Sequence, residues 1–137
     1  MKKIAFIILT LCFFASCSKE SEEPVEVNTF DTVLGRWEQV SYLSSGGYFV
    51  SQKDGSYYEF KTDKTFVKYT GTILNETKTG SFEYTPQNKS IRCDLGGGWY
   101  EVIEITFTDS KNAEFHIITN TGSSTIKVSR INGSKSY

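Results

Sequence analysis

Residues 99–131 have the sequence WYEVIEITFTDSKNAEFHIITNTGSSTIKVSRI, in which apolar and polar side chains alternate along three segments, 99–108, 113–119 and 124–131. Short clusters of Asp, Asn, Ser, Thr and Gly separate these segments. Alternation with a period of two is typical of β-strands that bury one face, and connections this short join neighbouring antiparallel strands in hairpins. This stretch therefore predicts three consecutive strands of an antiparallel sheet.

The same pattern extends towards the amino terminus. Further segments rich in Thr, Val, Ile, Tyr and Phe lie at 34–43, 57–61, 65–70, 79–85 and 90–95, and no segment from Leu34 onward has helical periodicity. The connections are short except for 44–56 and 71–78. Closing such a meander into a barrel removes the exposed edge strands that invite aggregation. We therefore expect an all-β fold, an eight-stranded antiparallel up-and-down β-barrel.

The alternation also predicts which side chains fill the barrel. Glu101 shares the inward parity of its strand. The third segment allows two arrangements, because either Phe66 and Lys68 point inward or Val67 and Tyr69 do so and Lys68 faces solvent. The apolar side chains predicted to point inward are Trp99, Ile103, Ile105, Phe107, Ile91, Cys93, Leu95, Phe115, Ile117, Ile126, Val128, Tyr58, Phe60, Phe82 and Tyr84.

The amino terminus has the pattern of a secretory signal peptide. Lys2 and Lys3 precede an apolar run over residues 4–15, and small residues stand before Cys17. This run is shorter than the ~20 residues that span a bilayer. The segment Phe14-Ala15-Ser16-Cys17 resembles the lipobox of bacterial lipoproteins, which implies cleavage before Cys17 and acylation of both its thiol and its new amino terminus. Secretory cleavage nearby is the alternative.

The residues after Cys17 form a predicted acidic linker. The lipoprotein resemblance implies several acyl chains, which anchor a protein durably. Ser18 follows Cys17 where an Asp would favour the inner membrane, so we expect an outer-membrane protein. Residues 19–23 resemble a tag that exports some lipoproteins to the cell surface, and a solvated tether has the same composition. We therefore expect a lipoprotein signal peptide over 1–16, a lipidated acidic linker over 17–33 and a β-barrel domain over 34–137.

The charge balance argues against a nucleic-acid-binding protein. The 137 residues include 15 Lys and Arg against 16 Asp and Glu, a net charge of −1, and no basic face is visible. Of the three cysteines, Cys12 leaves with the signal peptide and Cys17 is acylated, so Cys93 stands alone. A lone cysteine forms no internal disulfide, and the core must hold the fold.

The first predicted strand carries a family resemblance. Leu34-Gly35-Arg36-Trp37 is similar to the Gly-x-Trp signature of lipocalins, and residues 34–131 look like the small lipocalin-like domain of many bacterial lipoproteins. The resemblance implies that Trp37, next to Gly35, plugs the closed end of the barrel and that Arg130 packs across its ring. A guanidinium stacked on an indole gains ~0.5–2 kcal/mol. We therefore expect Gly35, Trp37 and Arg130 to form an end plug.

No residue set indicates catalysis or a metal site. His116, the single histidine, has outward parity, whereas Cys93 points inward, so neither a nucleophile with its base nor a zinc site can be assembled. A strand follows Gly96-Gly97-Gly98, where a phosphate loop needs a helix. Asp31-Thr32-Val33 resembles an O-glycosylation acceptor, with a plain linker as the alternative. We therefore expect no enzyme activity, no cofactor and no metal.

Glu101 is the residue that bears most on function. A carboxylate that points into an aromatic barrel must pair with a cation or line a solvent-accessible opening of the barrel, because burying it alone costs several kcal/mol. Pairing with Lys68 is the structural alternative, lining a ligand pocket is the functional one, and both stay open. The candidate ligand-binding residues are Glu101, Lys68, Tyr58, Phe82 and Tyr84.

Two functions follow from these features. The first is a lipid-anchored cell-envelope binding protein, whose lipocalin-like barrel holds a small apolar ligand between aromatic walls with few polar groups. The second is a structural or interaction lipoprotein whose barrel is filled by its own side chains. Such a protein contacts a partner through its loops, chiefly 44–56 with Tyr48 and Phe49. An eight-stranded barrel is just wide enough for side chains to fill it.

Overall fold

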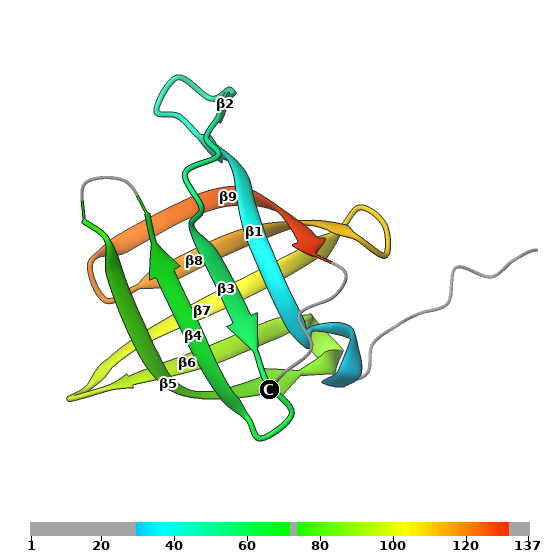
Figure 1. Ribbon diagram of the computed structural model, residues 1–137, viewed down its shortest axis with the longest axis vertical. Helices are drawn as coiled ribbons and strands as arrows, with labels where there is room; N and C mark the ends of the chain where they lie inside the picture. Colours follow the sequence, from blue (N-terminus) through cyan, green and yellow to red (C-terminus); the bar gives the residue numbers. More distant parts are fainter. Residues whose placement is uncertain (1–29, 72–73, 132–137) are drawn as a thin grey trace, which may run out of the picture.

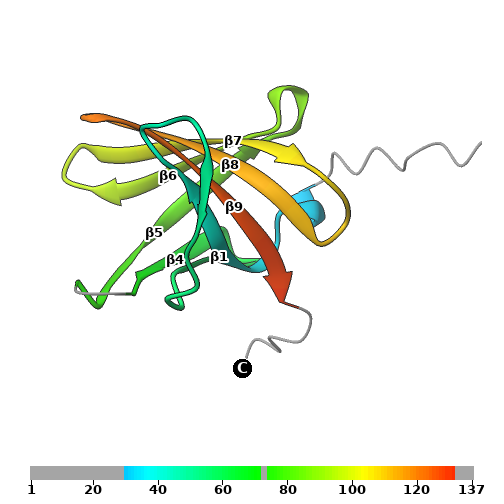
Figure 2. The same cartoon turned by 90° about the horizontal axis from the view of Figure 1, so that it is seen from above.

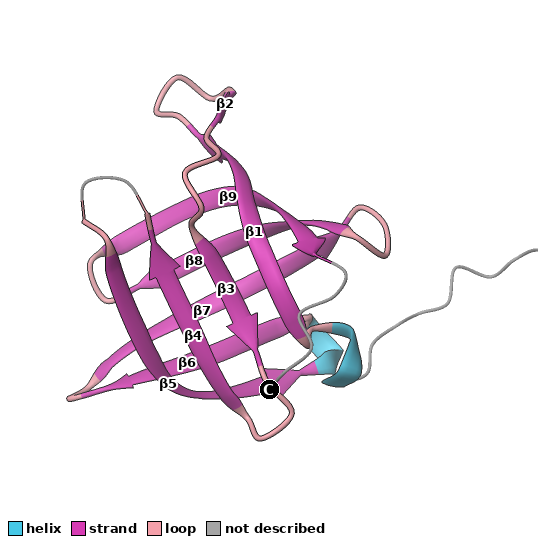
Figure 3. Cartoon of the chain, viewed as in Figure 1, coloured by secondary structure: helices cyan, strands magenta, loops and turns pink. Residues whose placement is uncertain are grey.

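The computed structural model describes residues 30–71 and 74–131. The predicted signal peptide, Cys17 and most of the predicted linker lie outside these residues. Figure 3 shows that strands and their connections make up nearly all of the described chain. The strands are β1 (Gly35–Leu43), β2 (Phe49–Ser51), β3 (Tyr57–Phe60), β4 (Thr65–Thr70), β5 (Glu76–Thr85), β6 (Ser90–Gly96), β7 (Trp99–Phe107), β8 (Asn112–Thr119) and β9 (Gly122–Ile131). Two short 3-10 helices complete the fold, η1 (Phe30–Thr32) and η2 (Pro86–Asn88).

The sheet closes into a barrel (Figures 1 and 2). From β3 to β9 each strand pairs with its sequence neighbour, and β1 pairs antiparallel with both β3 and β9. Trp37 on β1 stands opposite Arg130 on β9 in the closing pair. The prediction of an eight-stranded antiparallel up-and-down β-barrel is therefore confirmed. The additional strand, β2, pairs only with the end of β1 and projects from the barrel.

Three differences from the sequence expectation are larger than one residue at a strand end. The predicted connection 44–56 contains β2, because Ser44 and Tyr48 close a turn through a 2.9 Å backbone hydrogen bond. The strands β5 and β9 begin earlier than predicted, at Glu76 and Gly122. Their first residues are polar and show no apolar alternation, yet their backbones still pair with β4 and β8. Backbone pairing needs no particular side chain, so the apolar pattern underestimates strand length.

The fold begins before the predicted domain boundary at Leu34. Phe30 stacks on Phe82 with ring centroids 5.7 Å apart, and Val33 is fully buried. Residues 30–33 therefore belong to the packed barrel rather than to the linker. They sit where β1 starts and β9 ends, which we call the closed end; the opposite end, where β1 ends and β9 begins, is the open end.

Most of the fully buried side chains lie towards the closed end. Fully buried aromatic side chains there include Trp37, Phe60 and Phe66. The ring of Phe60 meets that of Phe82 edge to face with centroids 5.0 Å apart. The side chains predicted to point inward are buried, except that Tyr84, Leu95 and Phe107 are partly buried and Trp99 is exposed at the open end.

Candidate functional site

A buried ion pair lies inside the barrel. Glu101 on β7 is 5% exposed, and no other charged residue in the described part of the chain is buried. Its Oε1 pairs with Nζ of Lys68 on β4, and Tyr58 Oη on β3 donates a 2.8 Å hydrogen bond to its Oε2. The Lys68 ammonium also lies 5.3 Å from the centroid of the Tyr58 ring. Both carboxylate oxygens therefore have partners, which offsets the cost of burying the charge.

The sheet register brings these three side chains together. Tyr58 stands opposite Lys68 in the β3–β4 pair, and Glu101 reaches them from the far wall of the barrel. Phe66 is fully buried two residues before Lys68, so β4 points this pair inward. This is the first of the two arrangements that the sequence left open for that strand.

The ion pair affects the acidity of its neighbours. Burial and, secondly, Glu101 raise the pKa of the Tyr58 hydroxyl well above its usual value. Burial also raises the pKa of the Cys93 thiol, which faces Glu101 across the β6–β7 pair. Both groups are therefore protonated at neutral pH. Tyr58 acts as a hydrogen-bond donor, and Cys93 is a core thiol rather than a nucleophile.

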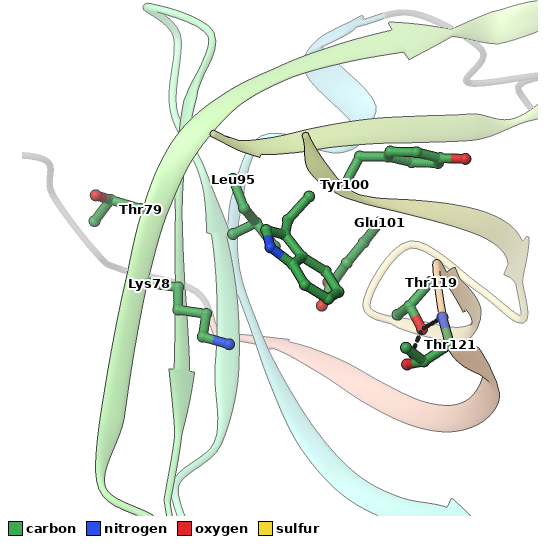
Figure 4. A pocket seen from close by; sticks show the side chains of 8 residues that line it. Lys78, Thr79, Leu95, Tyr100, Glu101, Thr119 and Thr121 are labelled. Carbon is green, nitrogen blue, oxygen red and sulfur yellow. Dashed lines mark hydrogen bonds between the residues drawn. The ribbon is translucent and has the colours of Figure 1, made fainter. Parts of the chain in front are cut away.

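A pocket of about 530 Å³ opens beside Glu101 at the open end. Trp99 is 57% exposed and lines this pocket together with Leu95 and Glu101, both of which are labelled in Figure 4. Figure 4 also shows the Lys78 ammonium directed towards this space and the Thr79 side chain turned away from it. The lining residues are Lys78, Thr79, Leu95, Trp99, Tyr100, Glu101, Thr119 and Thr121.

Several polar groups of this pocket already have partners in the fold. Thr119 Oγ1 donates to the Gly122 carbonyl at 3.0 Å and accepts from the Thr121 backbone N–H at 3.2 Å, so it holds the β8–β9 turn. Lys78 lies 3.5 Å from Glu76, and both side chains are about half exposed. Such a solvated ion pair contributes little free energy. The Lys78 ammonium and the Trp99 ring are therefore the groups best placed to contact a ligand.

A smaller cavity of about 200 Å³ lies on the other side of the ion pair. Glu101 lines the larger pocket and Lys68 lines the smaller cavity, so the pair stands between them. Glu101 thus both pairs with a cation and lines a pocket, and the two alternatives from the sequence coexist. The smaller cavity is lined by Trp37, Gln39, Ser56, Tyr57, Tyr58, Lys68, Tyr69, Thr70, Ile117, Ser124 and Ile126.

The opposite end is closed by Trp37 and Arg130. The Arg130 guanidinium lies 4.5 Å from the centroid of the Trp37 indole and donates to the Thr32 carbonyl. Trp37 Nε1 donates a 2.9 Å hydrogen bond to the Val33 carbonyl, so both side chains tie η1 to the barrel. Gly35 has a backbone φ of +106°, a value that residues other than glycine rarely adopt. The three residues of the predicted end plug are therefore together at the closed end.

The structure separates the predicted ligand-binding residues into two groups. Tyr58, Lys68 and Glu101 meet inside the barrel, as described above. Phe82 is buried in the aromatic core, and the partly buried Tyr84 lies towards the closed end, so neither lines the two cavities. Sequence reasoning missed Lys78, because it placed this residue in a connection. The residues around it, Glu76 to Thr79, are all polar, so no apolar alternation marked this part of β5 as a strand.

The remaining sequence candidates have structural roles. His116 lies on the outer face, where its Nδ1 contacts Thr125 Oγ1 at 2.9 Å. Gly96, Gly97 and Gly98 all have positive φ and form the β6–β7 turn. Thr32, in the segment that resembles an O-glycosylation acceptor, is buried in the fold, which argues against its modification in the folded protein. Within residues 30–71 and 74–131, no three His, Cys, Asp or Glu side chains gather as a metal site needs.

No family model matches the sequence, and no curated protein matches it. Among the described residues, no helix has the length and apolar character needed to cross a membrane.

Proposed function

We propose that this protein is a binding protein of the cell envelope, anchored by acyl chains on Cys17, whose barrel holds a small, largely apolar ligand at its open end. The observation that carries this proposal is the exposed Trp99 indole at a pocket of about 530 Å³. That volume lies within the ~300–1,000 Å³ of most small-molecule sites. A ligand that covers the Trp99 ring and Leu95 removes apolar surface from water, which favours binding.

The polar groups of the pocket orient such a ligand. The Lys78 ammonium stands on one side of the pocket and the Glu101 carboxylate on another. Because Glu101 already binds Lys68 and Tyr58, its charge is largely neutralised. A mostly apolar molecule with one polar end therefore suits the pocket better than a highly charged one.

The envelope location rests on the amino-terminal sequence. The apolar run, the small residues and Cys17 resemble a lipoprotein signal, and the acidic residues after Cys17 suit a solvated tether. We propose an outer-membrane location and no enzymatic activity. His116 on the outer face and Cys93 in the core lie on opposite sides of the barrel wall, so they do not form a catalytic pair.

One observation favours the second function, a structural or interaction lipoprotein. The closed half of the barrel is filled by aromatic side chains, and the Lys68–Glu101 pair occupies the interior above them. In that case the pocket at the open end is only the space between connections, and β2 with its turn contacts a protein partner.

The two functions are separated by purifying the full-length protein from its own host. Native mass spectrometry should show a co-purifying small molecule, and an environment-sensitive apolar dye should bind in its absence. Trp99→Ala should weaken dye binding several-fold. The matched control is Ile118→Ala, which removes another exposed apolar side chain from outside the pocket and should leave dye binding unchanged. A wild type that carries no molecule and binds no dye would favour the filled barrel.

A further inference from the structure

The two ends of the barrel present different side chains to solvent. Among residues 30–71 and 74–131, three large apolar residues are more than half exposed: Tyr48 at 65%, Leu74 at 69% and Trp99 at 57%. They belong to the turn before β2, the β4–β5 connection and the edge of the β6–β7 turn, which all lie at the open end. The closed-end connections 61–64, 86–89 and 108–111 have no exposed large apolar side chain.

Charged residues, in contrast, are more frequent in the connections of the closed end than in those of the open end. The closed-end connections contain Lys61, Asp63, Lys64, Lys89, Asp109 and Lys111. The open-end connections, 44–48, 52–56, 71–75, 97–98 and 120–121, contain only Lys53 and Asp54. Solvent-exposed tips contribute little to stability, so folding alone does not require this difference.

We propose that the open end docks onto a lipid surface, with Tyr48, Leu74 and Trp99 inserted at the level of the headgroups. Trp and Tyr prefer this interfacial region, where the apolar part of the ring is buried and its polar atom stays hydrated. None of the three has a charged residue directly next to it in the sequence, which reduces the desolvation cost of insertion.

The arrangement of the tips fits lipid better than protein. The three side chains come from separate connections, and glycine or polar residues stand beside each of them, such as Gly47, Asn75 and Gly98. A specific protein interface needs a continuous, closely packed apolar centre. A lipid surface is fluid, so each tip inserts independently of the others.

The chain outside the structure permits this orientation. It enters the fold at Phe30, at the closed end. Between Cys17 and Phe30 an extended chain reaches at most ~45 Å, whereas a ten-residue strand such as β5 spans ~33 Å. An anchor at Cys17 therefore leaves enough chain for the open end to face the same membrane. This step rests on the proposed anchor, but docking of the open end does not.

The test uses the full-length protein reconstituted into vesicles of phosphatidylethanolamine and phosphatidylglycerol. One set of vesicles carries bromine on the acyl chains close to the headgroups, and bromine quenches an indole only on contact. We expect emission to fall in the brominated vesicles through Trp99 and not through the buried Trp37. The Trp99→Phe variant should therefore lose this lipid-dependent quenching.

Two further variants keep Trp99 as the reporter. Tyr48→Ser combined with Leu74→Ser should reduce the quenching several-fold. The control Ile131→Ser, which removes a partly exposed apolar side chain at the other end of the barrel, should leave it unchanged. Thermal melts confirm that each variant is folded.

Three results would overturn docking on lipid. The first is equal emission in brominated and plain vesicles, and the second is quenching that persists unchanged in the double variant. The third is Trp99 emission that changes with protein concentration in the absence of lipid, which indicates contact between copies of the protein. If the protein proves not to be acylated, vesicles added from outside still test docking. Docking without any bound small molecule would reject the ligand proposal alone.

Discussion

At the scale of single residues, the Lys68–Glu101 pair is unequal in its exposure to solvent. The Glu101 side chain is 7% exposed, whereas that of Lys68 is 24% exposed. A charge that loses its partner costs more when water cannot reach it. Removing the lysine therefore costs more than removing the glutamate, because it leaves the more deeply buried charge unpaired. Glu101 then keeps only its hydrogen bond from Tyr58.

We expect Lys68→Met to lower the free energy of unfolding by about 3 kcal/mol, and Glu101→Gln by about 1–2 kcal/mol. The double variant should lose less than the sum of the two, since neither residue then leaves an unpaired charge. Urea unfolding of the three variants measures these differences. A double variant that loses the full sum would show that the two side chains do not interact.

The same Glu101→Gln variant bears on function. If the pocket holds a ligand, binding of the apolar dye should change, because Glu101 lines the pocket. Dye titration of the folded variant measures this change. Dye binding identical to that of the wild type would mean that the ligand does not reach Glu101.

Buried Tyr58 and Cys93 make the fold sensitive to alkaline pH. Both pKa values are raised in the folded protein, mainly by burial, so the folded state holds these protons more tightly than the unfolded state. The contribution of these two groups to the free energy of unfolding is therefore fully present below their pKa values in the unfolded state, about 8.5 for Cys and about 10 for Tyr. It is lost as the pH rises above these values. Urea unfolding between about pH 7 and pH 11 should show this decline. Cys93→Ala should delay its onset towards the range of tyrosine.

At the scale of elements, the closed end depends on the contact of η1 with β1 and β9. Trp37→Ala removes a fully buried indole and the hydrogen bond to Val33, so it should cost about 3–5 kcal/mol. Trp99→Ala removes an exposed indole and should cost less than about 1 kcal/mol. Comparing the urea midpoints of the two variants checks the end plug. A larger loss for Trp99→Ala would contradict it.

The strand β5 curves around the barrel (Figure 1), and Gly80 lies within it. A Cβ atom at this position would stand 1.9 Å from the Asp94 carbonyl oxygen and 2.9 Å from the Phe66 ring. Because the nearest atom is backbone, β6 would have to move. Gly80→Ala should therefore cost at least about 2 kcal/mol, whereas Ser81→Ala, on the exposed neighbour, should be close to neutral. Thermal melts compare the two, and equal stability would show that β6 moves easily.

At the scale of the whole molecule, the proposed anchor and the open end act at different places on the chain. Cys17→Ala should release the protein from the membrane, because the acyl chains on Cys17 are its proposed attachment. Fractionation of cells after palmitate labelling measures this release. Cys93→Ala is the control and should keep its label, since Cys93 is buried in the core. Label retained on Cys17→Ala would contradict the proposal that the protein is a lipoprotein.

Most of the barrel could be predicted from the sequence, because strand alternation and short hairpins are local signals. The inward residues Ile91, Ile103 and Phe115 follow from parity within their own strands. The strand β2 and the start of β5 could not be predicted, because polar residues there pair only through the backbone. Phe30 and Val33 carried no periodic signal, and their burial depends on how the closed end is shaped.

The sequence by itself determined the class of fold and the presence of a carboxylate inside the barrel, since each depends on alternation along single strands. The end plug was expected only from the resemblance to lipocalins, because Trp37 and Arg130 lie on β1 and β9. Only the tertiary structure decided which way Lys68 points and where the pocket lies. Lys68 and Glu101 are on β4 and β7, and they meet because the sheet closes through β1 and β9. A contact across a barrel depends on closure and register, which no single strand encodes.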